Sequence, residues 1–266
     1  MAELPIHKYF VFNGEIKSLK LYVPGQNDGG IYEVLRVVNG IPLFLEDHLD
    51  RFFHSAELAG KSITYSEVKI KQFIGDLIDK NKVAVGNILI SSKTNLEAFF
   101  TPHSYPTFEM YREGVNCGIL KAERDNPHAK VFQTTVRHRA DQLLAEKGFY
   151  EVLLIDHLGK VTEGSRSNVF FVSVDKLVTA PSNKVLLGIT RQKTLQMARD
   201  LNIPVSEREI NLSELSSFSA GFITGTSPKI LPILKIDAFK FDPKNEIVRQ
   251  LIQRYDELIE SYLNEA

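Results

Sequence analysis

The 266-residue sequence has a single cysteine, Cys117, which excludes an internal disulfide and any metal site built from several thiolates. Lysine and arginine total 32 against 33 acidic residues, so the formal charge of −1 gives no electrostatic basis for nonspecific nucleic-acid binding. No segment approaches the roughly 18 consecutive apolar residues that a membrane-spanning helix needs. Residues 1–8 lack the basic stretch and apolar run of a secretion signal. These absences predict a soluble, cytoplasmic protein.

Several motifs with defined chemistry are also missing. Neither G-x-G-x-x-G nor G-x-x-x-x-G-K is present, which removes the two common nucleotide-binding signatures. The 7 histidines form no H-E-x-x-H pair or other metal-ligand spacing, so we predict no metal and interpret them as structural or solvated. A serine–histidine–aspartate triad stays open, but no G-x-S-x-G elbow supports one.

The N-terminal part has strong signals for hairpins and helices. Asn13-Gly14 and Asn39-Gly40 each interrupt a run of strand-forming residues, which is typical of a β-hairpin. Amphipathic spacing and apolar runs predict helices over residues 45–59 and 65–80 and strands over 84–91 and 96–100. Two prolines then mark a connector, and we place the domain boundary near residues 104–112.

The C-terminal part mixes strands and helices without strict alternation. The predicted elements are strands over residues 115–120, 150–155, 169–172, 177–179, 221–224 and 230–236, and helices over 133–147, from 188 onward, and over 243–263. This order favours an α+β fold or a mixed sheet over a doubly wound fold. The chain is therefore predicted to have two domains, residues 1–108 and 109–266.

Three polar segments stand beside predicted strands or helices. Glu163 and the small residues Gly164–Asn168 could ligate a polar ring, although a satisfied turn is the plainer explanation. The start of a helix at Gly188–Arg191 offers amide hydrogens to an anion, although an ordinary threonine cap is commoner. Thr224–Pro228 could approach the same anion or be any loop.

Two basic residues carry little information when taken alone. Arg51 lies on a predicted helix whose other side is apolar, and a solvated charge explains it. Lys130 stands between a polar loop and a helix, and most lysines only solubilise a protein.

Taken together, these segments resemble the class IV (fold type IV) pyridoxal-phosphate enzymes. The matching blocks, in the order of the family, are Tyr32–Gly40, Glu46–Arg51, Gly159–Phe170, Leu187–Arg191 and Thr224–Pro228. The family includes branched-chain aminotransferases, D-amino acid aminotransferases and 4-amino-4-deoxychorismate lyases. The resemblance implies a small N-terminal α/β domain and a larger mixed C-terminal domain that carries the Schiff-base lysine.

The resemblance also implies a cofactor, pyridoxal 5′-phosphate, and a role for each matching residue. Lys130 would be the catalytic lysine that links to the cofactor aldehyde and moves the proton at the substrate Cα. Glu163 would keep the pyridine nitrogen protonated. The residues implied to hold the phosphate are Arg51, Ile189, Thr190 and Thr226, and those implied on the substrate side are Tyr32 and Ser227.

The sequence departs from the family pattern directly after the lysine. Relatives often have a small residue followed by asparagine, whereas this chain has Val131–Thr135. A tyrosine that is usual in this neighbourhood is missing, which bears on the polarity of the substrate side and not on the cofactor.

The family comparison leaves three functions open. An aminotransferase is favoured by Tyr32-Glu33, with a branched-chain-like amino acid and a 2-oxo acid as default substrates. The D-amino acid variety is not expected, because its carboxylate trap of arginine and histidine has no counterpart around Ser91–Asn95. The second is 4-amino-4-deoxychorismate lyase, which releases pyruvate and 4-aminobenzoate and resembles this chain at Asn126–His128. The third, a noncatalytic binding protein, conflicts with an intact Lys130 and Glu163.

The resemblance also bears on the oligomeric state. Relatives are commonly homodimers, so a homodimer is expected.

Overall fold

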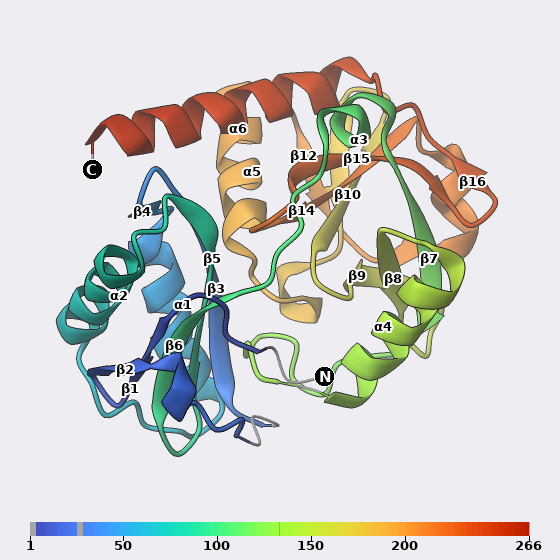
Figure 1. Cartoon of the computed structure of the whole chain (residues 1–266). Helices are drawn as coiled ribbons and strands as arrows, with labels where there is room; N and C mark the ends of the chain where they lie inside the picture. The colour runs from blue at the N-terminus through green and yellow to red at the C-terminus, as the bar shows by residue number, and fades with distance from the viewer. Residues whose placement is uncertain (1–3, 26–28, 133, 266) are drawn as a thin grey trace. The chain divides into compact units, whose positions relative to one another are not determined.

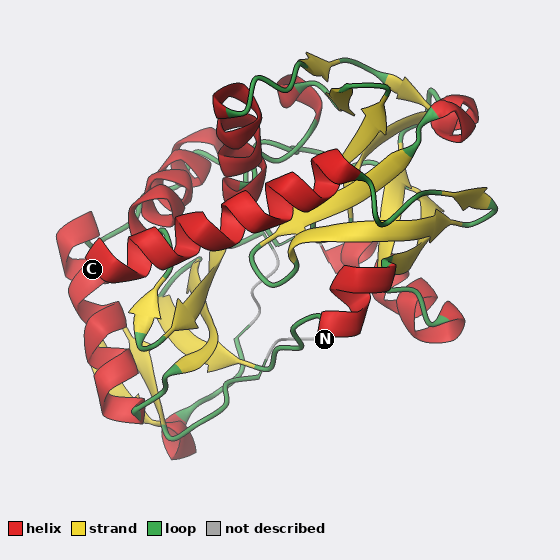
Figure 2. Cartoon of the chain, turned by 90° about the horizontal axis from the view of Figure 1, so that it is seen from above, coloured by secondary structure: helices red, strands yellow, loops and turns green. Residues whose placement is uncertain are grey.

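The computed structural model describes residues 4–25, 29–132 and 134–265, which form two compact units (Figure 1). Unit 1 comprises Met1–Ser104, Ala129–Gln133 and Ile259–Ala266, and unit 2 comprises Tyr105–His128 and Thr134–Leu258. Both units combine helices with strands (Figure 2). No helix in the described ranges is both long and apolar enough to cross a bilayer.

Unit 1 contains a six-stranded antiparallel sheet with the order β2-β1-β6-β5-β3-β4. The strands are β1 (Tyr9–Phe12), β2 (Glu15–Ser18), β3 (Ile31–Val38), β4 (Ile41–Pro42), β5 (Val85–Ser92) and β6 (Leu96–Thr101), with the short 3-10 helix η1 (Leu19–Leu21) after β2. Asn13 and Asn39 have positive φ angles of 49° and 53° and lie in the turns of the two expected hairpins. Both hairpins are therefore confirmed.

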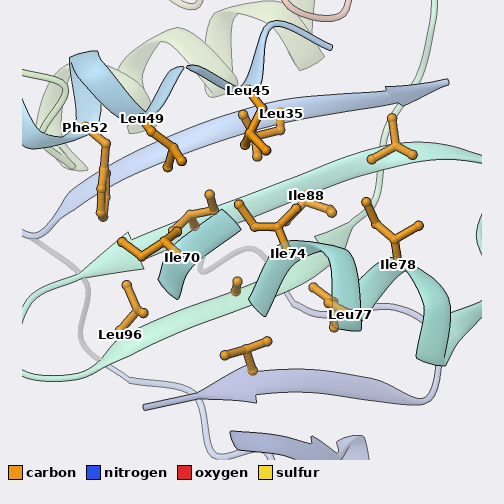
Figure 3. Packing of buried hydrophobic residues seen from close by; sticks show 14 of the residues in the cluster. Leu35, Leu45, Leu49, Phe52, Ile70, Ile74, Leu77, Ile78, Ile88 and Leu96 are labelled. Carbon is orange, nitrogen blue, oxygen red and sulfur yellow. The ribbon is translucent and has the colours of Figure 1, made fainter. Parts of the chain in front are cut away.

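Helices α1 (Leu45–Leu58) and α2 (Glu67–Asn81) bury their apolar faces against one side of this sheet. Figure 3 shows Leu49 of α1 and Ile74 of α2 directed into the same layer as Ile88 of β5. Because successive residues of a strand face opposite sides, the odd-numbered residues of β3 point into this layer. The opposite side of the sheet carries an aromatic cluster built around Phe10, Leu89 and Phe99.

Two segments that are distant in sequence complete unit 1. Val131 forms an isolated antiparallel bridge with Ile31, which places residues 129–132 beside β3. The ring centre of Tyr262 lies 5.0 Å from that of Phe44, and the Tyr262 hydroxyl donates a 3.4 Å hydrogen bond to the carbonyl of Pro42. Lys130 therefore belongs to the smaller unit, whereas we had expected it within the domain of residues 109–266. Pairing with β3 is the physical reason for the difference.

Unit 2 contains a mixed sheet with the order β12-β11-β10-β14-β15-β7-β8-β9-β13, and β16 pairs with β15. The strands are β7 (Val115–Lys121), β8 (Glu151–Ile155), β9 (Lys160–Gly164), β10 (Asn168–Ser173), β11 (Lys176–Thr179), β12 (Val205–Glu207), β13 (Ile210–Asn211), β14 (Ala220–Gly225), β15 (Lys229–Ile236) and β16 (Phe239–Lys240). Three pairs are parallel, namely β7–β8, β7–β15 and β11–β12, and the others are antiparallel. The expected mixed sheet is confirmed.

The helices that accompany this sheet are α3 (Phe108–Glu113), α4 (Thr134–Lys147), α5 (Ile189–Asp200), α6 (Glu246–Glu265) and the 3-10 segments η2 (Ser182–Lys184) and η3 (Leu212–Ser217). The helix expected from residue 133 is present as α4, and residue 133 itself lies outside the described residues. Sequence patterning missed α3, which begins directly after a proline-rich connector. Thr107 caps this helix, because its Oγ1 accepts a 3.2 Å hydrogen bond from the Met110 amide.

Burial within α1 supports a matched test of the unit 1 core. Leu49 is fully buried, whereas Leu58 on the same helix is 43% exposed. We expect Leu49→Ala to lower the free energy of unfolding by about 2–5 kcal/mol, because it removes buried methyl groups and leaves a cavity. Leu58→Ala should change it by no more than about 0.5 kcal/mol. Urea denaturation followed by circular dichroism compares the two, and equal losses would contradict the described packing.

Candidate active site

In unit 1, a buried carboxylate binds one edge of the Arg51 guanidinium through two hydrogen bonds. Glu33 on β3 is fully buried, and its Oε1 and Oε2 accept 2.7 Å hydrogen bonds from Arg51 Nε and Nη2. His48 lies three residues before Arg51 on α1, so both side chains share one helical face. Its Nδ1 lies 2.9 Å from Glu33 Oε2. Arg51 is thus a fixed and nearly buried charge, not the solvated one that local sequence suggests.

The charge states of this cluster follow from burial and pairing. Burial acts to raise the pKa of Glu33, but the Arg51 guanidinium and the His48 hydrogen bond outweigh it and hold the pKa well below its ordinary value. Burial lowers the pKa of His48, and the nearby Glu33 carboxylate opposes this effect only in part. At neutral pH the cluster therefore contains an ionised Glu33, a charged Arg51 and a neutral His48 that donates its Nδ1 proton to Glu33.

Lys130 lies beside the same strand, with its side chain on the aromatic side of the sheet. Its carbonyl accepts a 3.0 Å hydrogen bond from the Tyr32 amide, and its own amide donates a 3.1 Å bond to Ser55 Oγ on α1. Lys130 Nζ stands 4.8 Å from the centre of the Tyr32 ring. Phe132 stacks on that ring at 4.1 Å. The lysine amine is thus held over an aromatic platform, on a backbone anchored from two elements.

In unit 2, Glu163 on β9 is a second buried acid with a cationic partner. Its Oε1 lies 3.1 Å from Arg124 Nε, and its Oε2 accepts hydrogen bonds from the Leu186 amide at 3.2 Å and Asn168 Nδ2 at 3.4 Å. Arg124 also donates a 2.7 Å bond to the Ser165 carbonyl. Arg124 was not among the predicted site residues, because it pairs with a residue about forty positions away in sequence.

The start of α5 lies close to this acid. Gly188 precedes the helix, and no side chain of the described residues caps it. A Cβ at Gly188 would collide with Asn168 Oδ1, so glycine is required for the close approach. The first amides of a helix have no partner within the helix and favour an anion. Ile189 and Thr190 supply two of these amides.

The segment Thr224–Pro228, expected to approach the same anion, contains a hydroxyl group suited to bind one. Asn168 pairs across the sheet with Thr224, whose Oγ1 is buried without a hydrogen-bond partner among the described atoms. Thr226 and Ser227 follow directly after β14. The Thr190 hydroxyl is committed elsewhere, because its Oγ1 lies 3.3 Å from the Tyr255 hydroxyl. The amide of Thr190 is therefore a better candidate ligand than its side chain.

A carboxylate that sequence reasoning missed organises the loop after Glu163. Glu151 is 3% exposed, and its Oε1 accepts hydrogen bonds from the Val152 amide at 2.8 Å and from the amide and hydroxyl of Ser165 at 3.1 and 2.6 Å. Its Oε2 accepts from the Arg166 amide at 3.1 Å and from Ser167 Oγ at 2.8 Å. The acid within an otherwise apolar strand was the available sequence signal. The segment Ser165–Ser167 is therefore a turn built around a buried anion.

The sequence-predicted site residues fall into two groups. Arg51, Lys130 and Tyr32 belong to unit 1, and Glu163, Ile189, Thr190, Thr226 and Ser227 belong to unit 2. Among the described residues, no group of three or more His, Cys, Asp or Glu side chains is arranged to hold a metal ion.

Comparisons with known proteins identify the family of the chain and its fold. Residues 30–236 match the amino-transferase class IV family. The D-alanine aminotransferase of Staphylococcus aureus (strain COL) is 30% identical over 280 residues, covering 94% of this chain and 97% of the relative. The branched-chain amino acid aminotransferase of Thermobaculum terrenum, solved in its PLP-form, has a TM-score of 0.81 at 23% identity, covering 98% of this chain and 96% of that one. A Legionella pneumophila structure that bears the name 4-amino-4-deoxychorismate lyase has a TM-score of 0.78 at 20% identity, covering 90% and 96%.

The chain is a class IV enzyme with the fold type IV architecture. It belongs to the amino-transferase class IV family, as the match over residues 30–236 and the relative at 30% identity show. The resemblance inferred from the sequence blocks is therefore confirmed.

The turn around Glu151 gives a stability prediction. Glu151→Ala removes the acceptor of the Val152 and Arg166 amides and of two hydroxyls, while the Ser165 amide keeps its 2.9 Å bond to the Val152 carbonyl, and each buried unsatisfied group costs about 1–3 kcal/mol. We expect a loss of at least about 3 kcal/mol in the free energy of unfolding. Glu146→Ala is the control, because that exposed side chain makes one hydrogen bond, to Gln142. A loss no larger than in the control would refute the anchoring role.

Neutral burial of His48 gives a pH prediction. Its pKa in the folded protein lies below the ordinary 6.5, so the unfolded chain takes up the proton first as the pH falls. Stability is then complete above pH 6.5 and declines below it. His48→Asn keeps a donor near Nδ1 but does not titrate. We expect wild type to lose about 1 kcal/mol more than this variant between about pH 7 and pH 5. The free energy of unfolding is measured by urea denaturation at both pH values. An equal loss in wild type and in His48→Asn would contradict the assignment of a neutral, buried His48.

Proposed function

We propose that the protein is a pyridoxal-phosphate-dependent aminotransferase that moves an amino group between an amino acid and a 2-oxo acid. The observation that carries the proposal is the placement of Lys130, whose amine stands over the Tyr32 ring and whose backbone is fixed by β3 and α1. The family membership supports the class of reaction, and a branched-chain-like amino acid is the default donor.

The residues present fit this cofactor. The group has an aldehyde, a basic ring nitrogen and a phosphate, which call for an amine, a carboxylate and anion-binding donors. Lys130 is the amine, and Glu163 is a buried carboxylate held by donors on both oxygens. The uncapped start of α5 and the unpartnered Thr224 hydroxyl, both near Asn168, supply donor groups suited to a phosphate.

Each residue then has a chemical task. Pyridoxal phosphate, when bound, supplies an aldehyde for linkage to an amine and a ring that accepts the electron pair released at the substrate Cα. Lys130 would hold the cofactor covalently and carry a proton on Nζ. Glu163 would keep a proton on the ring nitrogen. Arg51, the amides of Ile189 and Thr190, and Thr226 would bind the phosphate, while Tyr32 and Ser227 would line the substrate side.

A lyase is the second candidate. It is supported by the shared fold with the Legionella pneumophila structure named as 4-amino-4-deoxychorismate lyase, and by the resemblance at Asn126–His128. The aminotransferase is favoured because Tyr32-Glu33 is typical of that branch and because the S. aureus relative at 30% identity is named an aminotransferase. We also infer a cytoplasmic homodimer, from the family resemblance, and sedimentation velocity tests the dimer.

Substitution of the lysine tests the proposal. Purified wild type should take up pyridoxal phosphate with a yellow colour that borohydride bleaches, and Lys130→Ala should show no reducible linkage. The variant should lose at least about 1,000-fold in transamination rate, because no other amine replaces Nζ. Lys121→Ala, which changes an exposed lysine on β7, is the control. A Lys130→Ala protein that keeps both the linkage and the rate would overturn the proposal.

The choice of substrate needs paired assays on the same preparation. L-isoleucine with 2-oxoglutarate tests the default aminotransferase, D-alanine with 2-oxoglutarate tests the activity named for the relative, and aminodeoxychorismate alone tests the lyase. Formation of 4-aminobenzoate and pyruvate, without amino transfer from either amino acid, would replace the aminotransferase with the lyase.

A further inference from the structure

We propose that Glu33 and His48 are positioning residues for the phosphate end of the cofactor and act by holding the Arg51 guanidinium in one orientation. This inference rests on the proposed function, because it takes Arg51 as a phosphate ligand. It assigns a task to two buried side chains that the proposed chemistry leaves without one.

The contacts restrict Arg51 more than a single ion pair would. Two hydrogen bonds of 2.7 Å join its Nε and Nη2 to the two oxygens of Glu33, so the planes of the guanidinium and the carboxylate are set together. Glu33 stands on β3, whose eight residues all pair with β5, and its own neighbour there is Ile90. The long arginine side chain is therefore fixed from its charged end by a rigid element.

His48 fixes the carboxylate in turn. Its Nδ1 donates to Glu33 Oε2 at 2.9 Å, and that oxygen also accepts from Arg51 Nη2. The imidazole is 3% exposed and belongs to the same helix as Arg51. His48 and Arg51, both on α1, thus donate to the same carboxylate on β3. Rotation of any of the three side chains breaks at least one of these hydrogen bonds.

Charge and orientation make opposite predictions for this cluster. Glu33 cancels the charge of Arg51, so if net charge governed phosphate binding, replacing Glu33 with a neutral residue would strengthen it. If orientation governs binding, the same replacement weakens it, because the guanidinium then samples several rotamers and must be ordered when the phosphate binds. The sign of the change therefore separates the two explanations.

The experiment compares two cofactor forms with each protein. Pyridoxal phosphate and pyridoxal, which lacks the phosphate, are titrated into apoprotein in phosphate-free buffer, and the dissociation constant is read from absorbance of the borohydride-reducible linkage. For Glu33→Gln we expect the constant for pyridoxal phosphate to rise by about 10-fold or more, which corresponds to about 1.4 kcal/mol. The constant for pyridoxal should stay within about 2-fold, since orientation of Arg51 matters only to the phosphate.

Two further variants keep the result interpretable if Glu33→Gln folds poorly. Glu33→Asp keeps the charge but withdraws the carboxylate by one methylene, and should also weaken binding of pyridoxal phosphate selectively. His48→Asn keeps a donor near Nδ1 and should remain near wild type, whereas His48→Leu removes it and should weaken phosphate-dependent binding. Glu57→Gln makes the same charge change at an exposed position of α1 and should have no effect.

Three outcomes would overturn the inference. Tighter binding of pyridoxal phosphate by Glu33→Gln would show that charge governs the site. Equal weakening for pyridoxal would show a structural role that is not specific to the phosphate. Unchanged binding in Glu33→Gln and Glu33→Asp would show no role. Wild-type protein that forms no reducible linkage with either compound would instead refute the proposed function.

Discussion

The antiparallel pairing of residues 129–132 with the edge of β3 is the contact on which the candidate site depends. Tyr32 donates to the Lys130 carbonyl, and Phe132 donates to the Gly30 carbonyl at 2.9 Å. Since alternate residues of an extended segment face the same side, this pairing directs Lys130 and Phe132 toward the ring of Tyr32. A reactive amine must be held in a defined position, and this does not require a regular strand. Here two backbone hydrogen bonds fix the position of Lys130 within an otherwise irregular segment.

Both units bury acids, and the way each acid is satisfied matches its proposed task. Glu33 and Glu163 are each paired with an arginine, and each also accepts hydrogen bonds from uncharged donors. Within the part of the chain that the structure describes, the carboxylate of Glu151 accepts hydrogen bonds from amides and hydroxyls and none from an arginine side chain. Burying an anion is costly unless its lone pairs are occupied, so these donor sets are conditions for folding as well as for chemistry. The site is thus preorganised by the same bonds that allow its charges to be buried.

Sequence patterning predicted the elements well where the signal was local. The two Asn-Gly hairpins, α1, α2, α5 and the strands of the large sheet's centre follow from turn residues and apolar spacing. It missed β9, and it missed the two-residue strand β13, which pairs with β9 across about fifty residues of sequence. The position of Lys130 in the smaller unit was missed for the same reason, because a two-residue pairing with β3 leaves no periodic pattern.

The site shows the same division between local and distant signals. Glu33 lies on the same buried face of β3 as Ile31 and Leu35, and this alternation was an available signal for a buried, paired acid that the sequence prediction did not use. His48 and Arg51 lie three residues apart on α1, which was sufficient to place them on one face. Arg124 had no such signal, since its role depends on reaching Glu163 across an intervening strand and helix. The contacts of Glu33 with His48 and Arg51, like the pair of Arg124 and Glu163, were found only in the structure, because each joins separate elements. The groups proposed to hold the cofactor lie in short continuous blocks of sequence, whereas the groups that recognise a substrate side chain are brought together by tertiary contacts.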